Sequence, residues 1–159
     1  MKYNRNKSVA YAHEWAYRRN PSYYNFDLTG GDCTNFISQC LYAGCGIMNY
    51  TRDTGWYYLS AKNRAAGWTG VEYLYRFLTT NQKSGPYAVN LPIANAEPGD
   101  IIQLSFDGNA YAHSLLVVNI SSSASGIAVA THTEDSDNRP LNTYWYQAAR
   151  LLHISGVRA

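Results

Sequence analysis

The sequence has few charged residues, and their signs nearly balance. Charged residues make up 15% of the 159 positions, and the formal net charge at pH 7 is +2. A basic surface large enough to bind nucleic acid is therefore not expected. The five prolines are scattered, and no charge block or repeat marks a linker or an array. We expect a single domain over residues 1–159, long enough to bury a sizeable core and present as a monomer.

Long apolar runs are also missing. No run approaches the ~20 residues that a membrane helix needs, so no membrane span is expected. The first six residues, Met1–Asn6, are polar and lack the apolar core of a signal peptide. The chain as given is expected to be soluble. Its compartment stays open, because a domain excised from an exported precursor would act outside the cell or at the cell wall.

Cysteine is scarce, and its positions are informative. The three cysteines, Cys33, Cys40 and Cys45, lie within thirteen residues. An odd number leaves at least one thiol free in any compartment. The spacings do not match the paired cysteines of zinc sites, so we expect no metal and no cofactor.

Aromatic residues, in contrast, are abundant, with fifteen tyrosines and four tryptophans. Such rings pack an apolar face and keep a polar tip in water, which suits a groove for a peptide or a sugar, although filling a core is an equally good explanation. Residues 52–69 have no clean period and are interpreted as a loop-rich aromatic segment. Within it, Trp56 and Trp68 are candidate substrate-binding residues.

The order of helical and strand patterns predicts the fold class. Helical spacing of apolar residues is found at 6–20, 33–43 and 70–80. Strand patterns come later, at 101–106, 113–120 and 127–133. Helices followed by strands predict an α+β domain in which an antiparallel sheet packs against the N-terminal helices.

Cys33 stands where a helix dipole can activate it. The Gly30-Gly31-Asp32 turn ends in a helix cap, and Gly44 is expected to stop the helix that follows. The positive end of the helix favours thiolate over thiol, whereas the charge of Asp32 opposes it. A cysteine nucleophile in this position therefore still needs a base.

Four histidines are candidates for the base: His13, His113, His132 and His153. His113 is preferred, because it opens a buried strand after a hairpin turn and can point at the start of a helix packed on the sheet. His132 ends the next strand, where a polar group can orient the base through its second ring nitrogen. His13 is expected to be exposed on a helix, and His153 to be a packed structural residue.

Three blocks carry a resemblance to a known family: Gly30–Leu41, Pro98–Gln103 and Ala112–Ser114. They resemble the bacterial putative amidase domain family, a branch of the NlpC/P60-like, papain-type cysteine hydrolases, and the likeness spans nearly the whole chain. The resemblance implies a papain-like α+β fold with a cysteine on a helix, a histidine at a strand start and a third polar residue on the next strand. On this chain these are Cys33, His113 and His132, with Asp135 or Asn138 as alternatives for the third.

The resemblance implies cleavage of amide bonds in bacterial cell-wall peptides, with a peptide or peptidoglycan stem as substrate. Many members of the superfamily have Ser-Gly after the cysteine, whereas this chain has Thr34-Asn35, so the exact substrate is not carried over. We predict a cysteine amidohydrolase that forms an acyl-thioester, which water or an amine then resolves. The backbone N–H of Cys33 is expected to hold the oxyanion, with Tyr24 a candidate second donor and Asp32 a further substrate contact. The alternative is a non-catalytic peptide- or glycan-binding module with an aromatic groove.

Overall fold

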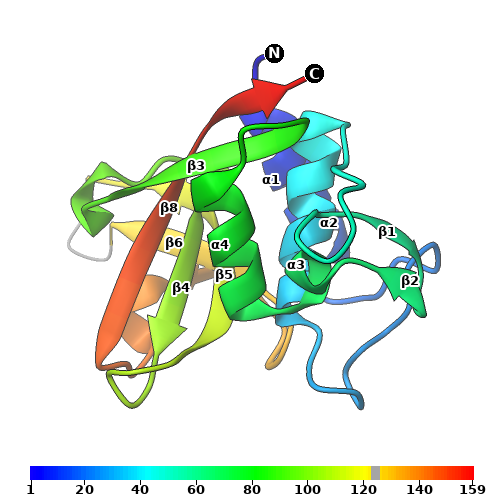
Figure 1. The fold of residues 1–159 in the computed structure, drawn as a ribbon. Coiled ribbons are helices and arrows are strands. Elements are labelled where there is room, and N and C mark those ends of the chain that lie inside the picture. Colours follow the sequence, from blue (N-terminus) through cyan, green and yellow to red (C-terminus); the bar gives the residue numbers. More distant parts are fainter. Residues whose placement is uncertain (123–125) are drawn as a thin grey trace.

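The first half of the chain supplies the helices and the second half supplies most of the main sheet (Figure 1). This computed structural model describes residues 1–122 and 126–159. Its helices are α1 (Arg5–Trp15), α2 (Cys33–Cys45), α3 (Ala66–Thr69) and α4 (Val71–Thr80), with short 3₁₀ turns η1 (Ile93–Asn95) and η2 (Leu141–Thr143). Among the described residues, none of the helices has the length and apolar character needed to cross a membrane.

Six strands form an antiparallel sheet in the order β3-β8-β4-β5-β6-β7. They are β3 (Gly85–Leu91), β4 (Ile101–Ser105), β5 (Tyr111–Ile120), β6 (Ile127–Thr131), β7 (Ser136–Pro140) and β8 (Ala148–Arg158). A separate small hairpin joins β1 (Tyr58–Ser60) to β2 (Asn63–Arg64). The predicted α+β class, with helices packed on an antiparallel sheet, is confirmed. Three of the six strands, β3, β7 and β8, were not predicted.

The N-terminal helices differ from their predicted bounds at their ends. The side chain of Asn4 caps α1 by accepting the Lys7 N–H at 3.0 Å, and α1 ends at Trp15, earlier than predicted. Helix α2 begins at Cys33 as predicted, but it continues through Gly44 to Cys45 and is capped by Gly46, whose φ is 69°. The prediction that Gly44 stops this helix is therefore wrong. Gly44 is instead the place where the N-terminal segment crosses α2, and its carbonyl accepts the Asn4 N–H at 2.9 Å.

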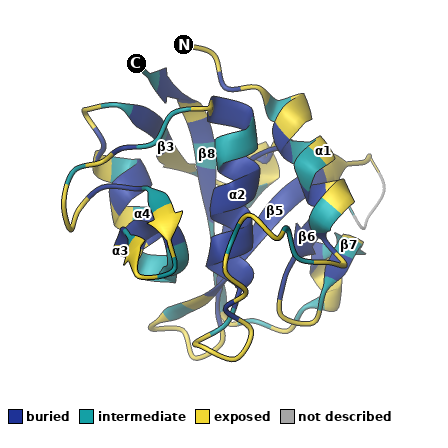
Figure 2. Ribbon diagram, turned by 90° about the vertical axis from the view of Figure 1, so that its right-hand side faces the viewer, coloured by how far each residue is buried: buried dark blue, intermediate teal, exposed yellow. Residues whose placement is uncertain are grey.

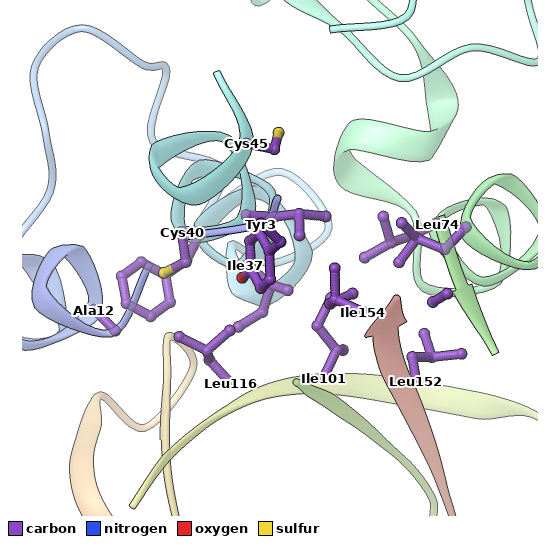
Figure 3. Packing of buried hydrophobic residues seen from close by; sticks show 14 of the residues in the cluster. Tyr3, Ala12, Ile37, Cys40, Cys45, Leu74, Ile101, Leu116, Leu152 and Ile154 are labelled. Carbon is purple, nitrogen blue, oxygen red and sulfur yellow. The ribbon is translucent and has the colours of Figure 1, made fainter. Parts of the chain in front are cut away.

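The main core fills the space between the helices and one face of the sheet. Figure 3 shows Tyr3, Ile37 and Cys40 meeting Leu116 and Ile154 in this layer. Strand side chains alternate between the two faces of a sheet, so their neighbours in sequence face the other way. The apolar residues on that opposite face form a second cluster, which includes Ile102, Leu104, Leu115, Val117 and Leu141.

Helix α2 is the central element of the fold. Figure 2 shows it buried along nearly its whole length, with β5 behind it. Its polar residues are buried too, and they have partners: the Ser38 hydroxyl donates to the Trp68 carbonyl at 2.8 Å, and the amide of Asn35 donates to the Tyr24 carbonyl at 3.0 Å. Satisfied polar groups of this kind fix a buried helix in one position. Cys33 therefore stands on a rigid support.

Candidate active site

Cys33 follows a turn made by two glycines in left-handed backbone conformations, Gly30 with φ 89° and Gly31 with φ 99°. Asp32 occupies the cap position of α2, but its side chain makes no capping hydrogen bond to the helix. In the described part of the chain, the N–H groups of Cys33, Thr34 and Asn35 have no acceptor. Unpaired N–H groups at a helix start can stabilise negative charge on the sulfur or on a bound oxyanion.

The three cysteines are all free, but their surroundings differ. Cys40 is fully buried, and burial raises the pKa of its thiol well above the ordinary value. Burial also raises the pKa of the Cys45 thiol, to about 11. Cys33 retains 9% exposure, and its sulfur lies 3.7 Å from the hydroxyl of Thr34. Because the thiolate is the reactive form, Cys40 and Cys45 are expected to be inert, and Cys33 is the candidate nucleophile.

Asp32 is enclosed by hydrogen-bond donors from four parts of the chain. Its Oδ1 accepts the Phe26 N–H and the Asn35 side-chain amide, both at 2.9 Å. Its Oδ2 lies 2.5 Å from Nδ1 of His132 and 3.6 Å from Nε of Arg19. The side chain is only 1% exposed. The prediction that Asp32 contacts substrate does not agree with this enclosure. Asp32 instead ties the turn before Cys33 to the rest of the fold.

His132 lies against α2 and is also enclosed. Its ring stacks on Phe36 with centroids 3.9 Å apart, and its Nε2 lies 2.8 Å from the Trp15 carbonyl oxygen. With Nδ1 on the Asp32 carboxylate, both ring nitrogens already have hydrogen-bond partners within the fold. The prediction that His132 orients His113 is therefore not supported by these contacts.

The other two candidates for that role have different partners. Asp135 accepts two hydrogen bonds from the Arg19 guanidinium, both at 2.9 Å. Asn138 lies in β7 in a left-handed conformation, with φ 54°. The Thr131 hydroxyl oxygen lies 3.4 Å from Nε2 of His113. The sequence predicted no role for Thr131 or Arg19, because their partners lie far away in the sequence.

His113 is the third residue of β5 and is mostly buried. Its ring centroid lies 6.2 Å from that of Tyr144 and 6.5 Å from that of Phe106. Burial lowers the pKa of His113 to about 4, and the positive charge of Arg139 contributes in the same direction. The imidazole is therefore neutral at pH 7, the form that a general base must have.

The structure brings the segments of Cys33 and His113 together but not their side chains. The hydroxyls of Thr34 and Ser114, the next residue in each segment, lie 3.0 Å apart. Ser114 therefore faces α2, and by alternation His113 faces the other side of the sheet, where Tyr144 packs. Among the described residues, the hydrogen-bond partner of the Cys33 sulfur is Thr34 and not His113.

A register shift lies beside His113. Leu104 pairs with His113, but the next residue, Ser105, pairs with Tyr111. Ala112 is thus left outside the pairing, and it is exposed. An extra residue in one strand is a β-bulge, and a shift of one residue exchanges the faces to which side chains point. His113 itself keeps the regular pairing with Leu104 and points to the same face of the sheet as Leu104 and Leu115, whereas the bulge changes the faces of the residues before it.

Trp56 and Trp68 are core residues. Both are fully buried, and their ring centroids are 4.7 Å apart. The Trp56 indole N–H donates to the Ser38 hydroxyl, and that of Trp68 donates to the side-chain oxygen Oδ1 of Asn35, each at 3.0 Å. The prediction that they line a substrate groove is wrong, since neither ring reaches the surface. This finding also weakens the interpretation of the chain as a binding module, because it removes two of the aromatic residues assigned to its groove.

Tyr24 is exposed at the edge of a surface concavity. The concavity has a volume of about 730 Å³ and lies between residues 21–28 and 58–61. The Tyr24 N–H donates to the Tyr58 hydroxyl at 2.8 Å, and its carbonyl accepts from Asn35. A substrate-binding role for Tyr24 is thus compatible with its position.

Glu97, Asp100 and His153 form a separate group of ligand-type side chains, with ligand atoms within 4.8 Å of one another. A cation already lies among them, because the Arg5 guanidinium is 2.7 Å from Asp100 and 3.5 Å from Glu97. His153 contributes Nδ1, 3.0 Å from the Asp100 carboxylate, in agreement with its expected structural role. His13 is 40% exposed on α1, as expected, and pairs with Asp137.

Comparison with known proteins gives two matches. A family model described as "Putative amidase domain" matches residues 2–155. The "Uncharacterized protein YhbB" of Bacillus subtilis (strain 168) is 33% identical over 161 residues. That alignment covers 99% of this chain and 49% of YhbB, so the chain spans about half the length of this curated relative. No solved structure matches the chain significantly.

Proposed function

Because the chain belongs to the putative amidase domain family, we propose that it is a cysteine amidohydrolase with Cys33 as its nucleophile. One observation carries the proposal. Cys33 is the cysteine at the start of the buried helix α2, beside N–H groups without acceptors, whereas burial raises the pKa of both other thiols. A helix start of this kind lowers the cost of forming a thiolate.

The proposed reaction has two steps. A base removes the proton of Cys33, the thiolate attacks the amide carbonyl carbon, and the protonated base gives its proton to the leaving amine as the C–N bond breaks. Water then attacks the acyl-thioester, releases the acid and restores the thiol. The N–H of Cys33 binds the oxyanion in both steps, and the Tyr24 hydroxyl is proposed as the second donor.

His113 is the proposed base, although its ring faces the other side of the sheet in this structure. We propose that the β5 end bearing Ala112 shifts by one residue, which turns the His113 ring toward α2 while Ser114 keeps its bond to Thr34. The exposed bulge at Ala112 supports this, since bulges commonly re-aim side chains next to active sites. Catalytic hydrogen bonds are also often unformed before substrate binds.

Asp32 and His132 are proposed as positioning residues and not as members of a triad. They fix the turn that carries Cys33 through the contact between His132 Nδ1 and the Asp32 carboxylate. The guanidinium of Arg19, 3.6 Å from the same carboxylate, places a positive charge beside it. The opposing effect of Asp32, expected from its place in the sequence, is therefore offset in part by Arg19.

The proposed substrate is a peptide amide, with bacterial cell-wall stems as the first class to test. This follows from the resemblance of the GGDCTNF block to the NlpC/P60-like, papain-type hydrolases, which is itself a proposal. Action as a monomer, outside the cell or at the cell wall, is proposed on the same basis. The chain spans about half the length of YhbB. Any activity assigned to a whole protein of that length is therefore also part of this proposal.

The test is selective alkylation with iodoacetamide, followed by peptide mass mapping. Cys33 should react faster than a simple thiol at neutral pH, whereas Cys40 and Cys45 stay protected while the protein is folded. His113→Gln should slow the alkylation of Cys33 and remove the part of its pH dependence that comes from the base. His13→Gln, an exposed control on α1, should leave the alkylation rate unchanged. His132→Gln tests positioning: it should slow alkylation while leaving the shape of the pH profile intact.

Digestion of purified peptidoglycan and short peptides tests the chemistry. Wild type should release fragments of defined mass, and Cys33→Ala should release none. If Cys33 reacts no faster than a simple thiol, and fragment release survives Cys33→Ala, the proposal fails.

A further inference from the structure

A surface concavity lies next to the loop that precedes the candidate nucleophile, and Cys33 is not among its lining residues. Its volume of about 730 Å³ falls in the ordinary range for ligand sites. One wall is the loop of residues 21–28 that precedes α2, and the other is the strand β1 with Ala61. Figure 1 shows this loop and the β1–β2 hairpin on the same side of the molecule. We call this concavity the tyrosine pocket.

Both walls are tied to the first turn of α2. Asn35, two residues after Cys33, donates its side-chain amide to the Tyr24 carbonyl at 3.0 Å. The Tyr24 N–H in turn donates to the Tyr58 hydroxyl of the opposite wall at 2.8 Å. The Tyr23 ring packs on Tyr58, with centroids 5.1 Å apart. A group bound between these walls is therefore held at a fixed position relative to the Cys33 segment.

The lining of the tyrosine pocket selects against acids. Its residues include Leu28, which is fully exposed, and Leu59, which is 58% exposed. Within residues 1–122 and 126–159, no lysine, arginine or histidine lines it. The one carboxylate, Asp27, is already paired with Arg19 at 3.0 Å. Exposed aliphatic and tyrosine side chains around a concavity favour an apolar or aromatic group as the occupant.

We propose that the tyrosine pocket binds a bulky apolar or aromatic side chain of a peptide substrate, close in sequence to the amide bond that Cys33 attacks. The proposal rests on the proposed function, and it adds a substrate class: neutral peptides with a large apolar residue near the scissile bond. Tyr24, Leu28, Tyr58 and Leu59 are the specificity-determining residues.

The binding test uses the Cys33→Ala variant, so that no peptide is consumed. Two blocked peptides that differ only in phenylalanine or glycine at one position are titrated by calorimetry. The phenylalanine peptide should bind more tightly, and adding Leu28→Ser with Leu59→Ser should weaken its binding by roughly tenfold, the usual effect of removing apolar contact in a pocket. Val89→Ser, an exposed aliphatic residue of β3, is the matched control and should leave both affinities unchanged.

The kinetic test uses the same substitutions with Cys33 intact. KM for the phenylalanine peptide should rise, whereas alkylation of Cys33 by iodoacetamide should keep its rate. Equal binding of the two peptides, or equal weakening of both by the leucine substitutions, would overturn the pocket assignment. If the phenylalanine peptide binds selectively but the protein with Cys33 intact does not hydrolyse it, the pocket assignment stands and the amidohydrolase proposal is rejected. The two proposals can therefore fail separately.

Discussion

At the scale of single residues, neighbours in the sequence have unlike surroundings. Asp32 is enclosed by donors, whereas Cys33, the next residue, retains 9% exposure and has an N–H without an acceptor among the described residues. Ser114 bonds to Thr34 across the helix–sheet interface, whereas His113 packs beside Tyr144. A motif identifies which residues have reactive chemistry, but register and turn geometry decide what each side chain contacts.

The buried His113 should make stability depend on pH. Its pKa is about 4 in the folded chain, against 6.5 for an exposed histidine. Between these pH values the unfolded chain binds the proton and the folded chain does not, so the free energy of unfolding falls as pH falls from 6.5 to 4. The full effect is on the order of 3 kcal/mol.

Urea unfolding at several pH values measures this dependence. His113→Gln should flatten it between pH 4 and 6.5, whereas His13→Gln should leave it in place. An equally steep fall in the His113→Gln variant would show that other groups cause the loss of stability.

At the scale of elements, the contact between α2 and the N-terminal segment depends on Gly44. A Cβ added at Gly44 would clash with the Tyr3 ring and lie 2.8 Å from the Asn4 carbonyl oxygen. Backbone cannot move away as easily as a flexible side chain. The glycine is therefore required for close packing, and not for ending the helix as its sequence context suggested.

Gly44→Ala should destabilise the fold by about 1–3 kcal/mol, the usual cost of overpacking a tight interface. Ala43→Ser, one position earlier and half-buried, is the matched control and should cost much less. Chemical denaturation followed by circular dichroism measures both. Equal stability of Gly44→Ala and wild type would mean that the N-terminal segment does not lie against α2.

The strands show which elements a sequence pattern can identify. β4 and β5 contain near-continuous apolar runs, and they were predicted. β7 has the sequence Ser-Asp-Asn-Arg-Pro, which favours turns, and it forms a strand only by pairing with β6. β8 mixes arginine, histidine and glycine into its apolar residues. Strand propensity depends on pairing context, which local sequence does not contain.

At the scale of the whole molecule, helices and strands share one main core. The cluster that includes Tyr3 and Ile37 also includes Leu116 and Ile154, so the N-terminal helices cannot leave the sheet without exposing both (Figure 3). A shared core of this size favours all-or-none unfolding of one domain.

We expect a single transition for the whole chain. Tryptophan fluorescence, which reports on buried Trp56 and Trp68, and far-ultraviolet circular dichroism, which reports on the backbone, should give the same urea midpoint. Two separate midpoints would mean that the helices and the sheet unfold independently.

The local structure around Cys33 was more predictable from the sequence than the surroundings of the two histidines, for a physical reason. The helix start at Cys33 was predictable, because a Gly-Gly turn, a cap residue and an apolar stripe are local signals. The partners of His132, and the face to which His113 points, depend on residues far away in the sequence and on the register of the strands. Such features have no local signal.

The two ends of the chain meet at one pole of the molecule. The Met1 ammonium donates to the Val157 carbonyl at 2.7 Å, close to the end of α2 that carries Gly44, whereas Cys33 lies at the opposite end of that helix (Figure 1). A label, bead or surface attached at Ala159 would therefore leave the Cys33 end of α2 on the side away from the attachment. Under the proposed function, immobilised protein should still reach large, insoluble substrates.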